Sequence, residues 1–239
     1  MVSKGVVARG GGELPRWLWI GVPWAFFVSM PVVRLIDQDL HRLLFKNKEG
    51  FTEWATVAVL LPGLWAGVGI WRRRRTLPRR WVAAWLGIVT LAALYFAGEE
   101  ISWGQHLSGW ATPDFLARIN HQGETNLHNL KGMGIFDNVP RYAIWAWALV
   151  AGVVVPWRVR RGRLHLTAGS AADWFWPTWC CFWTALIAVL IRVPDRIDKL
   201  TGKQLAIFRD LRLSEPQEFY FALLLAIYLL SVRARLARA

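Results

Sequence analysis

Six long apolar stretches, separated by short polar or basic connections, constrain this sequence more than any other feature. They are Trp17 to Leu35, Trp54 to Trp71, Trp81 to Gly98, Tyr142 to Trp157, Trp174 to Ile191 and Phe219 to Val232. A helix needs about 20 mostly apolar residues to cross a hydrocarbon core about 30 Å thick. We therefore predict an all-α fold: a polytopic membrane bundle of six transmembrane helices that forms a single domain over residues 1–239.

The distribution of basic residues predicts the orientation of the chain. The formal net charge is +13, which in a soluble protein would indicate a nucleic-acid partner. With six crossings both termini lie on one side, which holds 16 Lys and Arg residues against Glu13 and Asp173. That side carries +14 and the opposite side −1. Because Lys and Arg are enriched on the cytoplasmic side of membrane proteins, we expect cytoplasmic termini, membrane lipids as partners and no nucleic acid.

Unusual polar residues gather in the connection that this orientation places on the outer side. The third apolar stretch ends in GEEISWGQHL, Gly98 to Leu107, and NHQGETNLHNL follows at Asn120 to Leu130. Apolar and aromatic residues flank both motifs. We therefore expect residues 98–140 to pack against the membrane as a re-entrant or interfacial helical hairpin.

The spacing within these motifs suggests a polar site. If the third helix continues past its apolar stretch, Glu99, Ser102 and His106 share one face, and in a second helix Glu124 and His128 share another. A carboxylate beside an imidazole can bind a metal ion or relay a proton. We therefore predict a divalent metal ion as cofactor. Its predicted ligands are Glu99, Glu100, Glu124 and His128.

The same residues are candidates for catalysis and binding, because carboxylates near a bilayer are unfavourable unless a cation, a donor or a metal pairs with them. The predicted catalytic residues are Glu99, Glu100 and His128. The predicted substrate-binding residues are Trp103, Gln105, Asn126 and Asn129. The alternative is that Glu99 and Glu100 reach water at the outer edge and that the second motif is a solvated loop.

Further glutamates precede the second and sixth apolar stretches. Glu49 and Glu53 lie in KEGFTEW, and Glu215 and Glu218 lie in SEPQEF. Carboxylates at helix N-termini cap the helix and complement its dipole, which accounts for these residues. Their position also allows the ends of helices two, three and six to converge, with basic residues such as Arg141 neutralising them.

The motifs also carry a resemblance. GEEISWGQ at Gly98 to Gln105, GWATPDFL at Gly109 to Leu116 and ETNLHNL at Glu124 to Leu130 resemble a group of small, uncharacterised bacterial integral membrane proteins. KEGFTEW is similar to the first acidic motif of the same group. The resemblance implies a polytopic protein of the bacterial inner membrane with its motifs on the outer face. It assigns no catalytic residue.

The sequence is compatible with three functions. The first is a metal-dependent hydrolase or transferase acting on a lipid or lipid-linked substrate, although the chain lacks a G-x-S-x-G motif. The second is a non-enzymatic assembly or lipid-binding factor that contacts a partner membrane protein or a second copy through Trp103, Trp110 and Phe115. The third is a proton- or cation-linked transporter or channel component, which the absence of charge near the centre of every apolar stretch disfavours.

Overall fold

A computed structural model describes residues 12–45, 50–121, 123–127, 130–132, 135–202 and 213–238. Helices joined by turns make up this part of the chain. Its only β-type pairing is an isolated antiparallel bridge between Asn120 and Leu130. The predicted all-α class is confirmed.

Six helices in the described ranges are long and apolar enough to cross a membrane. They are Trp17–Ile36, Phe51–Arg72, Arg80–Glu100, Asn138–Arg160, Ala171–Asp198 and Ser214–Leu236. Each contains one predicted apolar stretch and extends beyond it, because helical hydrogen bonding continues into the polar residues at the membrane boundary. The chain is therefore a multi-pass integral membrane protein.

Three of these spans are single helices: α3 (Phe51–Arg72), α4 (Arg80–Glu100) and α12 (Ser214–Leu236). The first span joins the π-helix η1 (Trp17–Gly21) to α1 (Val22–Ile36), and the fourth consists of α7 (Ile135–Trp147), the π-helix η4 (Ala148–Val154) and α8 (Val155–Arg160). The fifth is interrupted, with α9 (Ala171–Phe175) followed by η5 (Trp179–Cys181), α10 (Phe182–Leu190) and α11 (Val193–Thr201). Pro177 accounts for this break, because the residue before a proline avoids the helical conformation.

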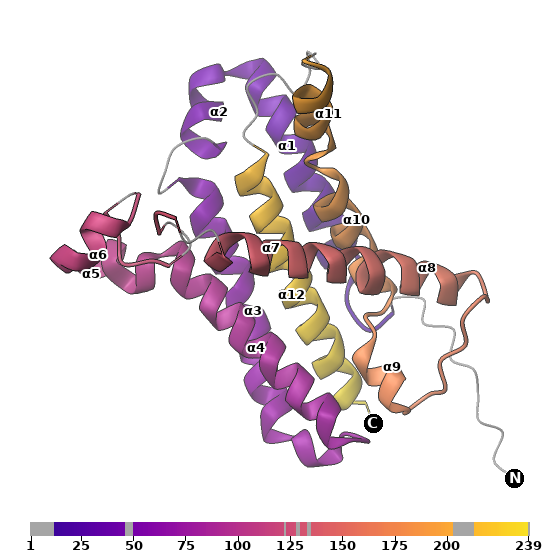
Figure 1. The fold of residues 1–239 in the computed structure, drawn as a ribbon. Coiled ribbons are helices and arrows are strands. Elements are labelled where there is room, and N and C mark those ends of the chain that lie inside the picture. The colour runs from indigo at the N-terminus through magenta and orange to yellow at the C-terminus, as the bar shows by residue number, and fades with distance from the viewer. Residues whose placement is uncertain are drawn as a thin grey trace, which may run out of the picture.

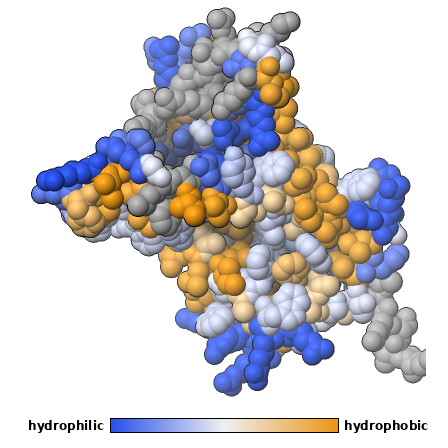
Figure 2. All heavy atoms as spheres, in the orientation of Figure 1, coloured by the Kyte–Doolittle hydropathy of each residue, from blue (hydrophilic) through white to orange (hydrophobic). Residues whose placement is uncertain are grey.

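Shorter helices occupy the connections. They are α2 (Gln38–Phe45), η2 (Arg74–Thr76), η3 (Ser102–Gly104), α5 (Gln105–Ser108) and α6 (Asp114–Ile119). The last two form an arm that projects from the bundle (Figure 1), hydrophilic along one edge and hydrophobic beneath it (Figure 2). Where the sequence predicted a re-entrant or interfacial helical hairpin, the described residues form these two short helices, followed by bends within residues 123–127.

Helix α12 lies at the centre of the bundle, between α3 and α4 on one side and α1 and α10 on the other (Figure 1). It is apolar on nearly every face, and most of its residues are buried. A helix that is hydrophobic all round is typically a buried one. The Phe219 ring stacks on Phe26 of α1 with a centroid distance of 3.9 Å, and the Tyr220 hydroxyl donates to the Pro23 carbonyl at 2.8 Å.

Small residues let the neighbouring helices approach closely. A Cβ added to Gly63 of α3 would lie 2.8 Å from the Cα of Ala226 in α12. One turn along α3, a Cβ on Gly67 would overlap the side chain of Thr90 in α4. Such contacts are characteristic of membrane bundles, where close packing replaces the hydrophobic effect as the force between helices.

The basic α3–α4 connection and both described chain ends lie at one end of the bundle. Arg73, after α3, donates to the Leu236 carbonyl at 3.4 Å, and Arg238 reaches the Glu13 carbonyl at 3.4 Å. Hydrophilic side chains cover this end, at the α3–α4 connection, and the free end of α8 (Figure 2). The polar motifs of residues 98–127 lie at the other end of α4.

Candidate functional site

Helix α4 ends at Glu100 because the following backbone leaves the right-handed helical region. Ser102, Trp103 and Gly104 have φ values of 45°, 57° and 93°. This conformation is unfavourable for residues with a side chain, so side-chain contacts must hold the turn. The Trp103 indole Nε1 donates to Glu99 Oε1 at 2.7 Å. Its ring covers Gly98 so closely that a Cβ there would lie 2.8 Å from it, which explains the glycine.

The two polar motifs bind each other through side-chain hydrogen bonds. The second carboxylate oxygen of Glu99 accepts from the Leu127 backbone N–H at 2.7 Å. Ser102 Oγ donates to Glu124 Oε2 at 2.8 Å. Gln105 Oε1 accepts from the backbone N–H of Thr125 at 2.9 Å. The turn after α4 and the loop at 123–127 therefore form one unit.

Two buried asparagines complete this network. Asn126 Nδ2 donates to Ser102 Oγ at 3.0 Å and to Glu124 Oε2 at 2.7 Å. Asn120 Nδ2 donates to the carbonyl and to the side-chain oxygen of Asn126, both at 2.9 Å. Buried polar groups need partners, and these side chains supply them to one another. The network holds the loop in place.

The predicted helical faces are wrong in both motifs. Because α4 ends at Glu100, Ser102 and His106 do not continue its face, and His106 belongs to the separate helix α5. Bends occur within residues 123–127, so Glu124 is not part of a helix. The physical reason is that side chains take the backbone N–H groups that a helix would use. Glu99 accepts from the Leu127 N–H and Gln105 from the Thr125 N–H, so these groups are not available for helical hydrogen bonds.

A cavity of about 330 Å³ lies between α4, α7 and α12. Small-molecule sites typically have volumes of about 300–1,000 Å³. Trp85 and Glu100 both line it and are 15 residues apart on α4, so it extends about 22 Å along that helix. Its apolar wall consists of Trp85, Ile88, Val89, Ala92 and Phe96 of α4, Ala143, Ile144 and Trp147 of α7, and Phe221 and Leu225 of α12.

The flank of the cavity opens between α4 and α7. Ile88 is 59% exposed, and Ala92, Pro140 and Ala143 are also exposed. These residues belong to helices that are apolar enough to span a membrane. The opening therefore lies on the exposed flank of helices that are apolar enough to cross a membrane.

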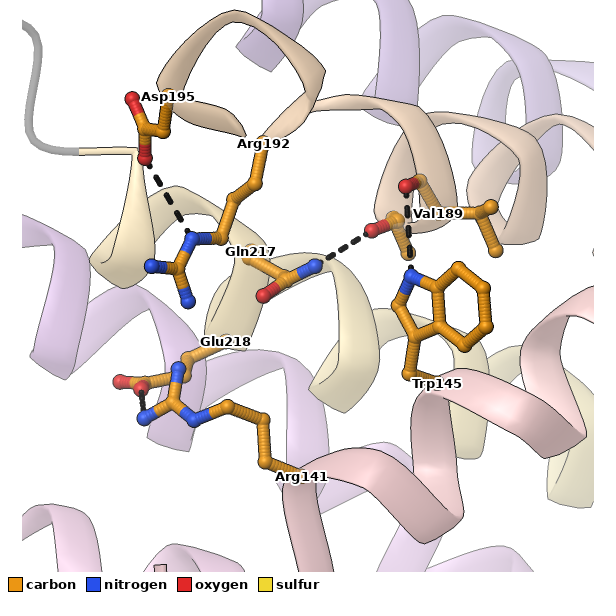
Figure 3. Close-up of polar contacts among 8 residues, drawn as sticks. Arg141, Trp145, Val189, Arg192, Asp195, Gln217 and Glu218 are labelled. Carbon is orange, nitrogen blue, oxygen red and sulfur yellow. Dashed lines mark hydrogen bonds and ion pairs between the residues drawn. The ribbon is translucent and has the colours of Figure 1, made fainter. Parts of the chain in front are cut away.

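Charged side chains occupy the end of the cavity near the end of α4. Arg141 of α7 donates through Nη2 to Glu218 Oε1 of α12 at 2.6 Å, and these side chains are 21% and 20% exposed (Figure 3). Glu100, which is partly buried, also lines the cavity. It makes no hydrogen bond or ion pair in the part of the chain that the structure describes. The cavity thus combines a long apolar wall with one polar end.

Neighbouring contacts fix the helices around this polar end. Gln217, beside Glu218 on α12, donates through Nε2 to the Ala188 carbonyl at 2.9 Å, and Trp145 of α7 donates to the Val189 carbonyl at 3.4 Å (Figure 3). Both carbonyls lie in the last turn of α10, where the helix offers them no internal partner. These bonds hold α7, α10 and α12 together where Arg141 meets Glu218.

The structure divides the predicted site residues into two groups. The network contains Glu99, Trp103, Gln105, Glu124 and Asn126. Glu100 instead lines the cavity and has no hydrogen-bond partner in the described ranges. Predicted roles for His128 and Asn129 fall on positions outside the described residues and stay predictions. Within the described ranges, no three His, Cys, Asp or Glu side chains form a group that could hold a metal ion. Three of the four predicted ligands therefore do not form such a group with one another.

The tryptophans of the cavity wall were not predicted from the sequence, whereas convergence of the ends of helices two, three and six, with Arg141 as counter-ion, was one of two interpretations. Trp85 and Trp147 of the cavity wall looked like ordinary membrane-span residues. Glu218 was interpreted as a helix-capping residue and Arg141 as a general counter-ion. The available signal was that both charges stand at the outer boundaries of apolar stretches, but only the packing of α7 against α12 makes them partners.

The chain matches no protein-family model, no curated protein and no solved structure.

Proposed function

We propose that this integral membrane protein binds a lipid or lipid-linked molecule in the cavity between α4, α7 and α12. The chain of that molecule lies along the apolar wall, and its polar end lies beside Glu100. One observation carries the proposal: a long apolar cavity ends at the partly buried carboxylate of Glu100, which has no hydrogen-bond partner among the residues that the structure describes.

The dimensions support a chain from one leaflet. The cavity follows α4 for about 22 Å, which exceeds half of the roughly 30 Å hydrocarbon core. Moving a chain from lipid into this cavity removes little water, so the hydrophobic effect contributes little to binding. Packing against the aromatic wall and contacts at the polar end must supply the affinity.

Photolabelling tests this proposal. The full chain in lipid nanodiscs is irradiated with a phospholipid that carries a photoactivatable group in its acyl chain, and labelled peptides are identified by mass spectrometry. We expect labels on α4, α7 and α12, and Ala92→Trp, which fills the cavity, lowers this labelling roughly tenfold, equivalent to about 1.4 kcal/mol. The control is Leu91→Trp, because Leu91 is 65% exposed and does not line the cavity. Equal labelling of wild type and Ala92→Trp contradicts the proposal.

An enzymatic role on the same molecule is the second candidate, and Glu100 favours it. A carboxylate without a hydrogen-bond partner at the polar end of a bound molecule can act as a general acid or base. We expect Glu100→Gln to lower turnover by roughly 10²–10⁴-fold. The assay is mass-spectrometric detection of products after incubation with a membrane lipid extract. Lipid binding without turnover by the wild type leaves the non-enzymatic binding function.

The divalent metal ion stays a prediction within this enzymatic hypothesis. It requires ligands beyond the described carboxylates, and His128 is the predicted one. Elemental analysis of the purified full chain tests whether a metal ion is bound. A stoichiometric metal that is lost in His128→Ala supports the hypothesis, and a metal-free protein with full turnover contradicts it.

We further propose that the protein resides in the plasma membrane of a bacterium with both termini in the cytoplasm. The resemblance of its motifs to bacterial inner-membrane proteins supports this. The basic α3–α4 connection, at the end that holds both described chain ends, also supports it. Single cysteines at Thr76 and Asp114, both exposed, test it. An impermeant thiol reagent added to intact cells should modify Asp114→Cys and spare Thr76→Cys, since native Cys180 and Cys181 are buried. The reverse pattern contradicts this orientation.

A further inference from the structure

We infer that the polar end of the molecule in the cavity is an ammonium group that pairs with Glu100, and not a phosphate. The inference rests on the proposed lipid-binding function and names the chemistry of the head group.

Glu100 is the group that a ligand would satisfy. It is partly buried at the end of an apolar cavity and makes no hydrogen bond or ion pair with any part of the described chain. A carboxylate in such surroundings is unfavourable until a donor or a cation reaches it. Its neighbour Glu99 shows the contrast, because both of its oxygens accept hydrogen bonds from within the protein.

Arg141, the guanidinium that lines the cavity, is already paired. Its Nη2 donates to Glu218 Oε1 at 2.6 Å. Its other terminal nitrogen, Nη1, is buried and makes no hydrogen bond in the described part of the chain. A phosphate bound through Nη1 would lie close to the Glu218 carboxylate on the same guanidinium, and that carboxylate repels it.

The charges that act on Glu100 also disfavour an anion. Among the described residues these are the carboxylates of Glu53, Glu215 and Glu218 and the guanidinium of Arg141. An added phosphate would be repelled by Glu100 and by this surplus of negative charge, whereas an ammonium is attracted to it. In an apolar environment the attraction is much stronger than in water, and charge-assisted hydrogen bonds are roughly twice as strong as neutral ones.

Competition photolabelling measures this preference. The photoactivatable lipid on the full chain in nanodiscs is displaced by hexadecylamine, hexadecanol or hexadecyl phosphate, which share one chain and differ only in the head group. We expect the amine to compete roughly tenfold better than the phosphate. In Glu100→Gln this advantage should disappear while the lipid still labels. Asp39→Asn removes the same charge at an exposed residue that neither lines the cavity nor acts on Glu100, and it should keep the advantage.

The ammonium can belong to an aminophospholipid or to a single-chain amine, and further competitors distinguish these two ligands. If phosphatidylethanolamine competes as well as hexadecylamine while phosphatidylglycerol does not, the ligand is an aminophospholipid. If hexadecylamine alone competes, the ligand is a single-chain amine. Both results support the inference.

Two results overturn it: the phosphate or phosphatidylglycerol competes as well as the amine, or Glu100→Gln retains the amine's advantage. Thermal unfolding of Glu100→Gln verifies that the variant is folded. Labelling that Ala92→Trp abolishes but that is indifferent to the head group refutes the ammonium alone. Labelling that Ala92→Trp does not change refutes the proposed function itself.

Discussion

Two adjacent glutamates at the end of α4 have opposite surroundings. Glu99 is 3% exposed and accepts one N–H on each oxygen, whereas Glu100 accepts none in the described part of the chain. Their side chains point about 100° apart on the helix, so one meets the loop of the second motif and the other meets the cavity. We therefore propose a structural role for Glu99 and a ligand-binding role for Glu100.

This contrast predicts different effects of the same substitution. Glu99→Gln places an amide NH₂ opposite a donor, either Trp103 Nε1 or the Leu127 N–H, and should lower the free energy of unfolding by about 1–3 kcal/mol. Glu100→Gln breaks no hydrogen bond in the described structure, so we expect a change within about 0.5 kcal/mol. Thermal or denaturant unfolding in detergent measures both. A larger loss for Glu100→Gln than for Glu99→Gln would contradict the assignment.

Glu13, at the opposite end of the bundle, predicts a dependence on pH. Burial by itself raises the pKa of Glu13, but hydrogen bonds from Thr178, its own backbone and Ser231, together with the charge of Arg235, outweigh burial and lower the pKa below its usual 4.5. Ser231 Oγ donates to Glu13 Oε1 at 3.0 Å. Because the folded pKa is depressed, the carboxylate stabilises the fold above the unfolded pKa, and this contribution is lost as pH falls through the folded pKa.

The comparison of wild type with Glu13→Gln isolates this effect. The wild type should be the more stable protein near neutral pH, and the difference in unfolding temperature should shrink as the pH falls below about 4.5, the usual glutamate value. Asp39→Asn, in an exposed ion pair with Arg42, is the control and should change stability little. A difference that grows on acidification would reverse the sign of the prediction.

At the scale of elements, α3, α4 and α12 depend on glycine for their separation. A Cβ on Gly63 would lie 2.8 Å from the Ala226 Cα, a backbone atom that cannot rotate away. Gly63→Ala should therefore force α3 from α12 and destabilise the protein by about 1–3 kcal/mol, as overpacking does. In Gly21→Ala the nearest heavy atom is 3.7 Å away, so that variant should be neutral or slightly more stable. Equal stability of the two variants in unfolding experiments would refute the close contact.

Apolar length predicted every membrane helix, because crossing the bilayer leaves the backbone no other way to satisfy its hydrogen bonds. The spacing of residues within the motifs predicted helices that do not form where side chains bind the backbone N–H groups, as Glu99 and Gln105 do. It also could not foresee that Ser102 and Trp103 adopt positive φ. Most of the polar residues of the motifs that lie in the described ranges bind one another.

At the scale of the whole molecule, the site depends on which helices are neighbours. Arg141 and Glu218 are 77 positions apart and meet because α7 packs near α12. No periodicity within a single helix contains that information, so the cavity and its wall were absent from the prediction. Contact with a partner membrane protein or a second copy through Trp103, Trp110 and Phe115 stays a prediction. These side chains are 44%, 46% and 67% exposed.

The central claim is that the cavity between α4, α7 and α12 holds a lipid, and native mass spectrometry of the full chain released from mild detergent tests it most directly. We predict that the wild type and Leu91→Trp each retain one lipid per chain and that Ala92→Trp, which fills the cavity, loses it. Equal lipid retention by all three proteins, or none by the wild type, would contradict the claim.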